Sequence, residues 1–131
     1  MNIKTKIYAT GATLGSHEIA TESLLEEAGF DRIGLPLNLI EKELGITHVR
    51  HSADSVKPGD LAIAAGEIAI RRSGVGASEI DAVIFCGIDW EYSEPATTLR
   101  VAHELGINAL HCWDQSDDCH GFTTGIITPT C

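Results

Sequence analysis

Apolar residues gather in short runs along the chain, and helix-like segments alternate with these runs. The segments with strand character are 3–10, 82–88 and 107–113. The segments with helical character are 18–28, 37–44, 60–73 and 96–105. Strands that alternate with helices usually pair in parallel and are joined by right-handed crossovers. The pattern therefore predicts an α/β fold with a mostly parallel sheet and covering helices.

The segment 60–73 is the clearest helix, and Pro58 precedes it at a position suited to a helix start. The residues on one face at helical spacing are Leu61, Ala64, Ala65 and Ile68. Ile63 and Ile70 make the opposite face apolar as well, which predicts a helix covered on both sides. The uninterrupted apolar run 82–88 likewise favours a strand covered on both faces.

Composition places the chain among globular proteins. Its 131 residues, 44% of them hydrophobic, suffice for one domain over 1–131 with a modest core. It holds no apolar run near the ~20 residues of a membrane span, and its first residues lack the apolar stretch of a signal peptide. A cytoplasmic location with reduced cysteines follows by default. A net charge of −10, from 9 basic and 19 acidic residues, disfavours nucleic acid and anionic membranes as partners.

The strongest chemical signal lies in residues 117–122, whose sequence is Asp-Asp-Cys-His-Gly-Phe. It places Cys119 between the predicted strand 107–113 and a run that opens a helix. A cysteine at a helix N-terminus faces unpaired N–H groups and the positive end of the helix dipole, and both favour the nucleophilic thiolate. Cys119 is therefore a candidate nucleophile. The alternative is an inert thiol, because most free cysteines act as small buried apolar residues.

The same stretch resembles the active-site segment of β-ketoacyl-acyl-carrier-protein synthase III and its relatives in the thiolase superfamily. In that family an aromatic residue and an aspartate end a strand, and a Cys-small-Gly-Phe turn follows. Here Trp113 and Asp114 precede Cys119 at the family's interval. Further landmarks in the family's order are Leu44-Gly45-Ile46, Arg50, Asp60-Leu61-Ala62, Ile80-Asp81-Ala82-Val83-Ile84, Pro95 and Leu105-Gly106-Ile107. Their order and spacing make the resemblance more specific than any one of them.

The resemblance implies the N-terminal half of a thiolase-like fold, as a single half domain over 1–131, in fatty acid or polyketide biosynthesis. Cys119 would accept an acyl group from coenzyme A or acyl-carrier protein for a Claisen condensation. The N–H groups of the turn, that of Gly121 among them, would stabilise the oxyanion. Arg50 would lie near the mouth of the coenzyme A pocket. The thioester is a substrate here, and the resemblance implies no cofactor and no metal.

The family's catalytic His and Asn belong to its second half, and no residue of this chain matches them. The helix after the nucleophile also stops early, because Pro129 disfavours helix at Thr128. We therefore expect a chain truncated after the nucleophile turn that turns over only if a second half completes it. The expected partners are a second-half polypeptide or a second copy in a homodimer, with the strand 107–113 as the contact. The alternative is a truncated or subunit-like, non-catalytic partner of a condensing enzyme.

Some residues depart from the family pattern or suggest other chemistry. Glu94 stands where the family has an aromatic residue that closes the acyl tunnel, which disfavours long acyl substrates. Asp118 replaces a small neutral residue, and its carboxylate would oppose ionisation of the neighbouring thiol. A minor alternative is a metal-binding domain, because zinc accepts two Cys and two His. Its candidate ligands are His111, Cys112, Cys119 and His120.

Overall fold

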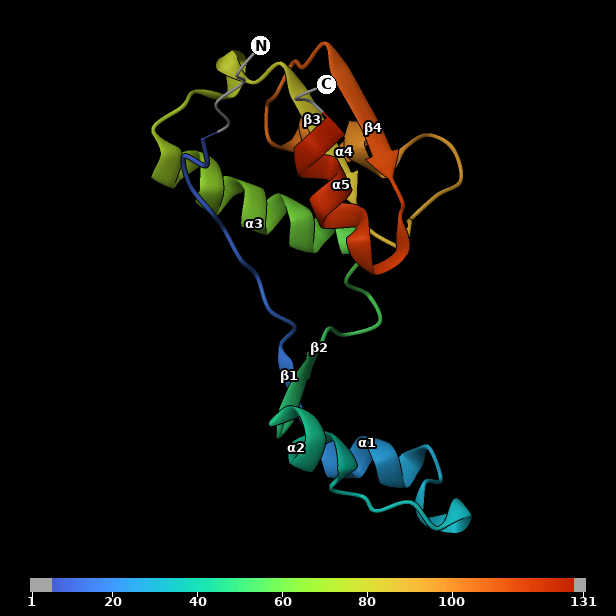
Figure 1. Cartoon of the computed structure of the whole chain (residues 1–131). Coiled ribbons are helices and arrows are strands. Elements are labelled where there is room, and N and C mark those ends of the chain that lie inside the picture. The colour runs from blue at the N-terminus through green and yellow to red at the C-terminus, as the bar shows by residue number, and fades with distance from the viewer. Residues whose placement is uncertain (1–5, 129–131) are drawn as a thin grey trace. The chain divides into compact units, whose positions relative to one another are not determined.

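The computed structural model describes residues 6–128, which group into two compact units (Figure 1). The smaller unit is Leu14–Val56, and the larger unit holds the described residues before and after it. Each unit contains its own two-stranded sheet. Within the described range, no helix has both the length and the apolar character needed to cross a membrane.

The smaller unit combines two helices with a short antiparallel sheet. Its elements, in order, are β1 (His17–Ala20), α1 (Thr21–Glu27), a 3₁₀ turn (Asp31–Ile33), α2 (Leu39–Leu44) and β2 (His48–His51). β1 and β2 run antiparallel, so that His17 lies opposite His51. Thr21 is buried at the start of α1, and its N–H donates to the Thr47 carbonyl oxygen at 2.9 Å. This bond ties α1 to the segment that leads into β2.

The antiparallel pair corrects the helix predicted over 18–28, because the first residues of that segment form β1. Ala20 is extended, with φ −66° and ψ 138°, and the helix starts only at Thr21. Pairing with β2 overrides the local helical pattern here, and a strand's stability depends on such distant neighbours. α2 ends where the sequence predicts, because Gly45 adopts a left-handed conformation with φ 69°.

The larger unit carries the parallel sheet and the candidate nucleophile. Its elements are α3 (Pro58–Ser73), a 3₁₀ turn (Ala77–Glu79), β3 (Ala82–Cys86), α4 (Thr97–Glu104), β4 (His111–Gln115), a 3₁₀ turn (Asp118–His120) and α5 (Gly121–Ile127). β3 and β4 run parallel, with Ala82 opposite His111. α4 packs against both strands and against α3, while α5 packs against β3 (Figure 1). This arrangement confirms the predicted α/β class with a parallel sheet and covering helices.

The ends of these elements follow the predictions to differing degrees. α3 starts at Pro58 and is followed by Gly74 at φ 71°, as the proline and glycine indicate. β3 already ends at Cys86, earlier than the predicted run 82–88. The strand predicted over 107–113 is shifted along the chain, since β4 starts at His111.

The N-terminal strand predicted over 3–10 is wrong for its described residues 6–10, which form no strand, and residues 3–5 lie outside the described range. The chain packs against α3 at Gly11 instead. A Cβ at Gly11 would lie 2.0 Å from the Ala65 carbonyl oxygen, so this close approach requires glycine. The Arg72 guanidinium also donates to the Thr10 carbonyl oxygen at 3.1 Å.

α3 is half-buried along most of its length, which corrects the expectation that it is covered on both sides. Gly59 is its one buried residue, and every residue of β3 is half-buried. The buried apolar residues of the larger unit are Val101, Ala102 and Ile107. The core therefore lies between α4 and the parallel strands, and apolar surface of α3 and β3 remains partly open.

Candidate functional site

Cys119 lies in the turn between β4 and α5, where the sequence predicts the nucleophile. β4 ends at Gln115, the thiol belongs to the 3₁₀ turn Asp118–His120, and α5 starts at Gly121. Cys119 is exposed and its thiol is free. In parallel α/β sheets, binding sites form beyond the carboxyl ends of the strands, and the turn occupies that position after β4.

Side chains and backbone of the turn hold it against the helix that follows. The Thr124 hydroxyl on α5 donates to the Asp117 carboxylate at 2.6 Å, and the His120 N–H donates to the Asp117 carbonyl oxygen at 2.8 Å. Asp118 has a positive φ of 43°, a conformation that Asp tolerates better than most residues. The aspartates on the N-terminal side of Cys119 therefore shape the turn, which the family resemblance did not indicate.

Gly121, which the sequence suggests as part of the oxyanion site, is buried at the start of α5. Its backbone N–H donates to the Asp118 carbonyl oxygen. The group expected to face an oxyanion thus has an acceptor within the turn in this conformation.

Two glycines bring α5 close to β3. A Cβ at Gly125 would lie 2.3 Å from the Cys86 Sγ, and one at Gly121 would lie 3.9 Å from the Cys86 Cβ. Burial raises the pKa of the Cys86 thiol, so this cysteine favours the neutral form. Cys86 therefore serves as a packing residue under α5, whereas Cys119 is the exposed thiol of the turn.

The Asp114 carboxylate at the end of β4 receives the first N–H groups of α4. It accepts the Thr97 N–H at 2.7 Å, the Thr98 N–H at 2.9 Å, and the Thr98 hydroxyl. Partial burial works to raise the pKa of this carboxyl, but the bonds from Thr98 and Thr97 outweigh it and hold the pKa below its usual value. Thr98 is fully buried, and its hydroxyl oxygen accepts the Phe85 N–H at 3.3 Å. This network joins β3, β4 and α4 just before the Cys119 turn.

The loop between β3 and α4 holds a buried carboxylate that the sequence pattern does not indicate. The Glu91 side chain is only 2% exposed. Its Oε1 accepts an Arg100 N–H at 2.6 Å and the Gly59 N–H at 2.8 Å. Arg100 also pairs with Asp60 on α3. The only sequence signal is a glutamate between two aromatic residues, which does not by itself predict burial.

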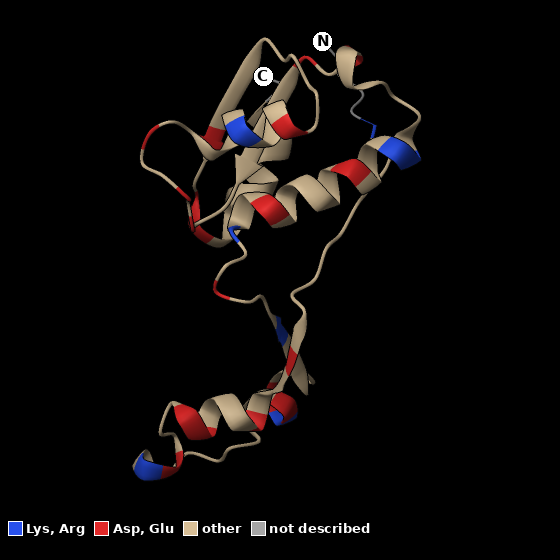
Figure 2. Cartoon of the chain, turned by 180° about the vertical axis from the view of Figure 1, so that it is seen from behind, with Lys and Arg blue, Asp and Glu red and all other residues tan. Residues whose placement is uncertain are grey.

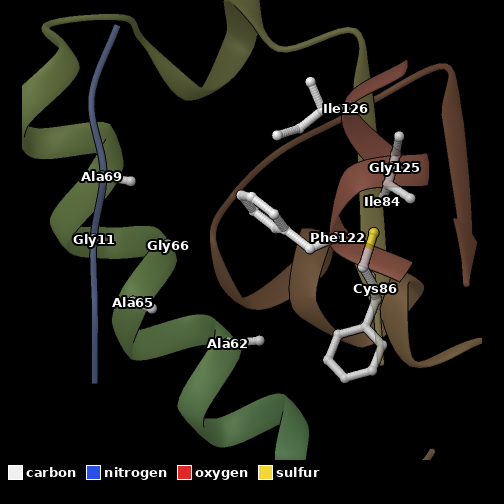
Figure 3. Close-up of a pocket in the computed structure, with 11 residues that line it drawn as sticks. Gly11, Ala62, Ala65, Gly66, Ala69, Ile84, Cys86, Phe122, Gly125 and Ile126 are labelled. Carbon is white, nitrogen blue, oxygen red and sulfur yellow. The ribbon is translucent and has the colours of Figure 1, made fainter. Parts of the chain in front are cut away.

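An open apolar groove of about 660 Å³ lies between α3 and α5 (Figure 3). Its lining residues are Gly11, Ala62, Ala65, Gly66, Ala69, Ile84, Phe85, Cys86, Phe122, Gly125 and Ile126. Small residues of α3 form one side, and Phe122 and Ile126 of α5 project from the other (Figure 3). Phe122 is 73% exposed although it is large and apolar. Cys119 is not among the lining residues.

Arg50 lies on β2 in the smaller unit, whereas Cys119 belongs to the larger unit. Its guanidinium pairs with the Glu18 carboxylate at 2.9 Å, and both side chains are largely exposed. The structure thus shows a surface ion pair for Arg50, and its contact with coenzyme A stays a prediction.

The proposed Cys/His ligands do not converge on a metal centre. Within residues 6–128, no group of three or more His, Cys, Asp or Glu side chains is arranged to hold a metal ion. His111 and Cys112 are neighbours on β4, so their side chains leave the strand on opposite faces. The minor alternative of a zinc site is therefore not supported.

Acidic residues occur along both units, and basic residues are fewer (Figure 2). On α3 the basic residues Arg71 and Arg72 occupy the last turn, at the end where cations are favoured by the helix dipole. An acidic carrier protein would need a basic surface to dock on, and this adjacent pair is the only one in the sequence.

Comparison with known proteins gives a consistent group of relatives, although no family model matches the chain. A β-ketoacyl-[acyl-carrier-protein] synthase III of Aliarcobacter butzleri is 30% identical over 122 residues, which are 92% of this chain and 36% of the relative. An acyl-CoA:acyl-CoA alkyltransferase of Shewanella oneidensis is 30% identical over 99 residues, 75% of this chain and 28% of that protein. The chain thus spans only 28% to 36% of the length of these curated relatives.

Solved structures share the fold. Cerulenin-bound OleA of Xanthomonas campestris superposes with a TM-score of 0.82 at 22% identity, over 94% of this chain and 37% of OleA. The 3-oxoacyl-(acyl carrier protein) synthase III of Xanthomonas oryzae gives a TM-score of 0.81 at 21% identity, over 94% of this chain and 37% of the enzyme. At this identity the likeness concerns the fold, and both neighbours have a thiolase-like fold.

Proposed function

Since the chain belongs with the β-ketoacyl-[acyl-carrier-protein] synthase III-like condensing enzymes and has the fold of their N-terminal part, we propose that it provides the acyl-accepting site of such an enzyme. The observation that carries the proposal is the exposed, free thiol of Cys119 in the turn after β4. A nucleophile that takes an acyl group must be reachable from solvent, and Cys119 meets this requirement.

The reaction assigned to Cys119 is transfer of an acyl group from a thioester. The Cys119 Sγ, as thiolate, attacks the thioester carbonyl carbon and forms a new C–S bond. The tetrahedral oxyanion collapses, the bond to the leaving sulfur breaks, and the leaving thiolate takes up a proton from solvent. Backbone N–H groups of the turn stabilise the oxyanion. Because the Gly121 N–H is bonded to the Asp118 carbonyl oxygen, its use requires this bond to open.

We favour a coenzyme A thioester over acyl-carrier protein as the acyl donor. The chain has a net charge of −10 and a single pair of adjacent basic residues, Arg71 and Arg72. A carrier protein with an acidic surface would meet mostly like charge here. Arg50 is the residue proposed to meet coenzyme A, with its guanidinium exchanging Glu18 for a phosphate group.

Condensation itself requires groups beyond this chain. The family resemblance places the His and Asn that act on the second substrate in its other half. We propose that they come from residues outside this chain, in a second polypeptide or in further sequence of the same protein. The open groove between α3 and α5 supports this, because its apolar lining fits a covered face better than an exposed one.

A non-catalytic role as a partner of a condensing enzyme is the second candidate. It is favoured by the Gly121 N–H, which is already bonded, and by the aspartates Asp117 and Asp118 beside the thiol. Such a chain would keep the fold and the groove without accepting acyl groups.

Intact mass spectrometry after incubation with acetyl-coenzyme A separates the two candidates. An acyl-accepting chain gains one acetyl group, Cys119→Ser abolishes the gain, and the matched Cys112→Ser retains it. Equal labelling of both variants would remove Cys119 from its proposed role. No labelling of the wild-type chain, alone or with the rest of the enzyme, would favour the non-catalytic role.

A further inference from the structure

The loop between β3 and α4, residues 87–96, lies beside the turn that carries Cys119. β3 and β4 are neighbouring parallel strands, so the segments that follow them leave the sheet at the same edge. The Gly87 N–H donates to the Gln115 carbonyl oxygen at 3.3 Å and joins the starts of the two segments. The loop and the segment that leads to Cys119 therefore start side by side at the same end of the parallel strands.

Glu91 stands out within the loop because it is buried where its neighbours are exposed. Its side chain is 2% exposed, whereas Trp90 is 47% and Tyr92 is 57% exposed. An ionised carboxylate is buried only at considerable cost unless it is paired and hydrogen-bonded. The Glu91 Oε1 has such partners in the Arg100 guanidinium and the Gly59 N–H, whereas the buried Oε2 has no hydrogen-bond partner among the described residues.

The Glu91 contacts reach both helices that flank the loop. Gly59 belongs to the first turn of α3, and a Cβ there would lie 2.3 Å from the Glu91 Oε1. Arg100 lies on α4 and bridges Glu91 to Asp60 of α3. The Asp60 carboxylate also accepts the Lys57 N–H at 2.8 Å. One carboxylate in the middle of the loop is thus bonded to two separate helices.

The role of Glu91 goes beyond joining the helices, since α3 and α4 pack together through other residues as well. The bonds of Glu91 also anchor the middle of the loop, with Trp90 on one side and Tyr92 on the other. We propose that Glu91 is a positioning residue that holds loop 87–96 beside Cys119 and so controls how acyl thioesters reach the thiol. This inference rests on the proposed acyl-accepting function.

Charge removal at constant shape is the appropriate test, because Glu91→Gln keeps an oxygen for the Gly59 N–H and weakens the bond to Arg100. Arg100 is partly exposed and keeps Asp60, so the variant leaves no unpaired buried charge and should stay folded. The matched control is Asp89→Asn, an exposed carboxylate of the same loop. A second variant, Arg100→Lys, keeps the positive charge but lacks the planar guanidinium that can bond two carboxylates at once.

Two reagents distinguish the access of a thioester to Cys119 from the intrinsic reactivity of the Cys119 thiol. We expect Glu91→Gln to raise the acetyl-coenzyme A concentration for half-maximal Cys119 acylation about tenfold. The rate of Cys119 alkylation by iodoacetamide, a small reagent, should stay within about twofold of wild type, because the turn itself is intact. Arg100→Lys should shift the same concentration in the same direction, and Asp89→Asn should leave it unchanged.

The loop can also be observed without any acylation. Trp90 and Trp113 are the two tryptophans, so in a Trp113→Phe background Trp90 reports on the loop. Glu91→Gln should change Trp90 emission and speed proteolysis within the loop, and Asp89→Asn should not.

If Glu91→Gln matches Asp89→Asn in emission, proteolysis and acylation, the positioning role is wrong. A parallel fall of acylation and alkylation would also overturn it in favour of a general structural role. If the wild-type chain is not acylated while the loop responds, the proposed function fails but the hold of Glu91 on the loop stands.

Discussion

The Thr124 hydroxyl donates to the Asp117 carboxylate at 2.6 Å, and these residues lie on either side of Cys119 in the sequence. The bond closes the turn onto α5 and limits the positions that the thiol can take. Asp118 within the turn has φ 43°, and residues in this region persist where neighbouring bonds hold them. The geometry around the candidate nucleophile thus depends on a bond between two side chains that flank it.

We predict that Thr124→Val slows the acylation of Cys119 and lowers the free energy of unfolding only slightly. The substitution keeps the shape and removes the donor, and a hydrogen bond of this exposed kind contributes about 0.5–1.5 kcal/mol. Urea unfolding and time-resolved mass spectrometry measure the two effects. The exposed neighbour gives the control Thr123→Val, which should change neither quantity. Equal acylation rates in both variants would show that the turn does not need this bond.

The chain alone should not condense acetyl and malonyl thioesters, because no residue matches the family's His and Asn. A positioned acid or base contributes about 10²–10⁴-fold, so the loss of such groups leaves activity near background. Product formation can be followed with labelled malonyl-coenzyme A. Robust condensation by the purified chain would mean that its own residues replace the missing groups, and His120→Ala would be the first variant to examine.

Acid should destabilise the larger unit through Asp114. Because folding lowers the pKa of this carboxyl, the unfolded chain takes up the proton first as the pH falls. The stabilisation is present above the unfolded pKa of about 3.9 and is lost as the pH falls through the lower folded pKa. We expect Asp114→Asn to cost about 1–3 kcal/mol at pH 7 and much less near pH 2. Denaturation at both pH values measures the difference, and an equal cost at both would refute the assignment.

We predict that the chain exposes its apolar groove and associates through apolar surface. Phe122 lines the groove and is 73% exposed, and Leu110, in the segment expected at the dimer contact, is 82% exposed. Phe122→Asp should reduce binding of a hydrophobic dye, and Leu110→Asp should weaken a homodimer. Both changes lie on the surface, so stability should change by no more than about 0.5 kcal/mol.

Light scattering and dye fluorescence on fresh protein separate these contacts. A wild-type chain that stays monomeric at micromolar concentration and binds no dye would mean that its own residues cover the apolar surface. Loss of association in Phe122→Asp but not in Leu110→Asp would place the contact at the groove.

Local signals in the sequence predict part of this fold well. Pro58 and Gly74 mark the ends of α3, and Gly45 marks the end of α2, since each fixes the backbone by its own chemistry. β1 was missed because it is only four residues long and its existence depends on pairing with β2. Pairing partners that are distant in sequence leave little trace in a short segment.

In the candidate site, too, some features follow from local sequence and others depend on distant contacts. The position of Cys119 between a strand and a helix follows from the order of the residues around it. The burial of Glu91 does not, because Asp89 and Glu94 in the same loop are also acidic and both are exposed. Which of the three is buried depends on where Arg100 and Gly59 lie in space, and that arrangement is set by helix packing.

Position 59 is a glycine and carries no side chain, and this restricts which substitutions the protein can accept during evolution. An alanine there would put a methyl carbon 2.3 Å from the Glu91 Oε1, so the helix would lose its fit to the loop. In a lineage that keeps the glutamate, a side chain at position 59 would force its carboxylate to move, so glycine is favoured there; a lineage that loses the glutamate is freed from this constraint. Positions 59, 91 and 100 should therefore vary together among close homologues, as one inherited unit separate from Cys119.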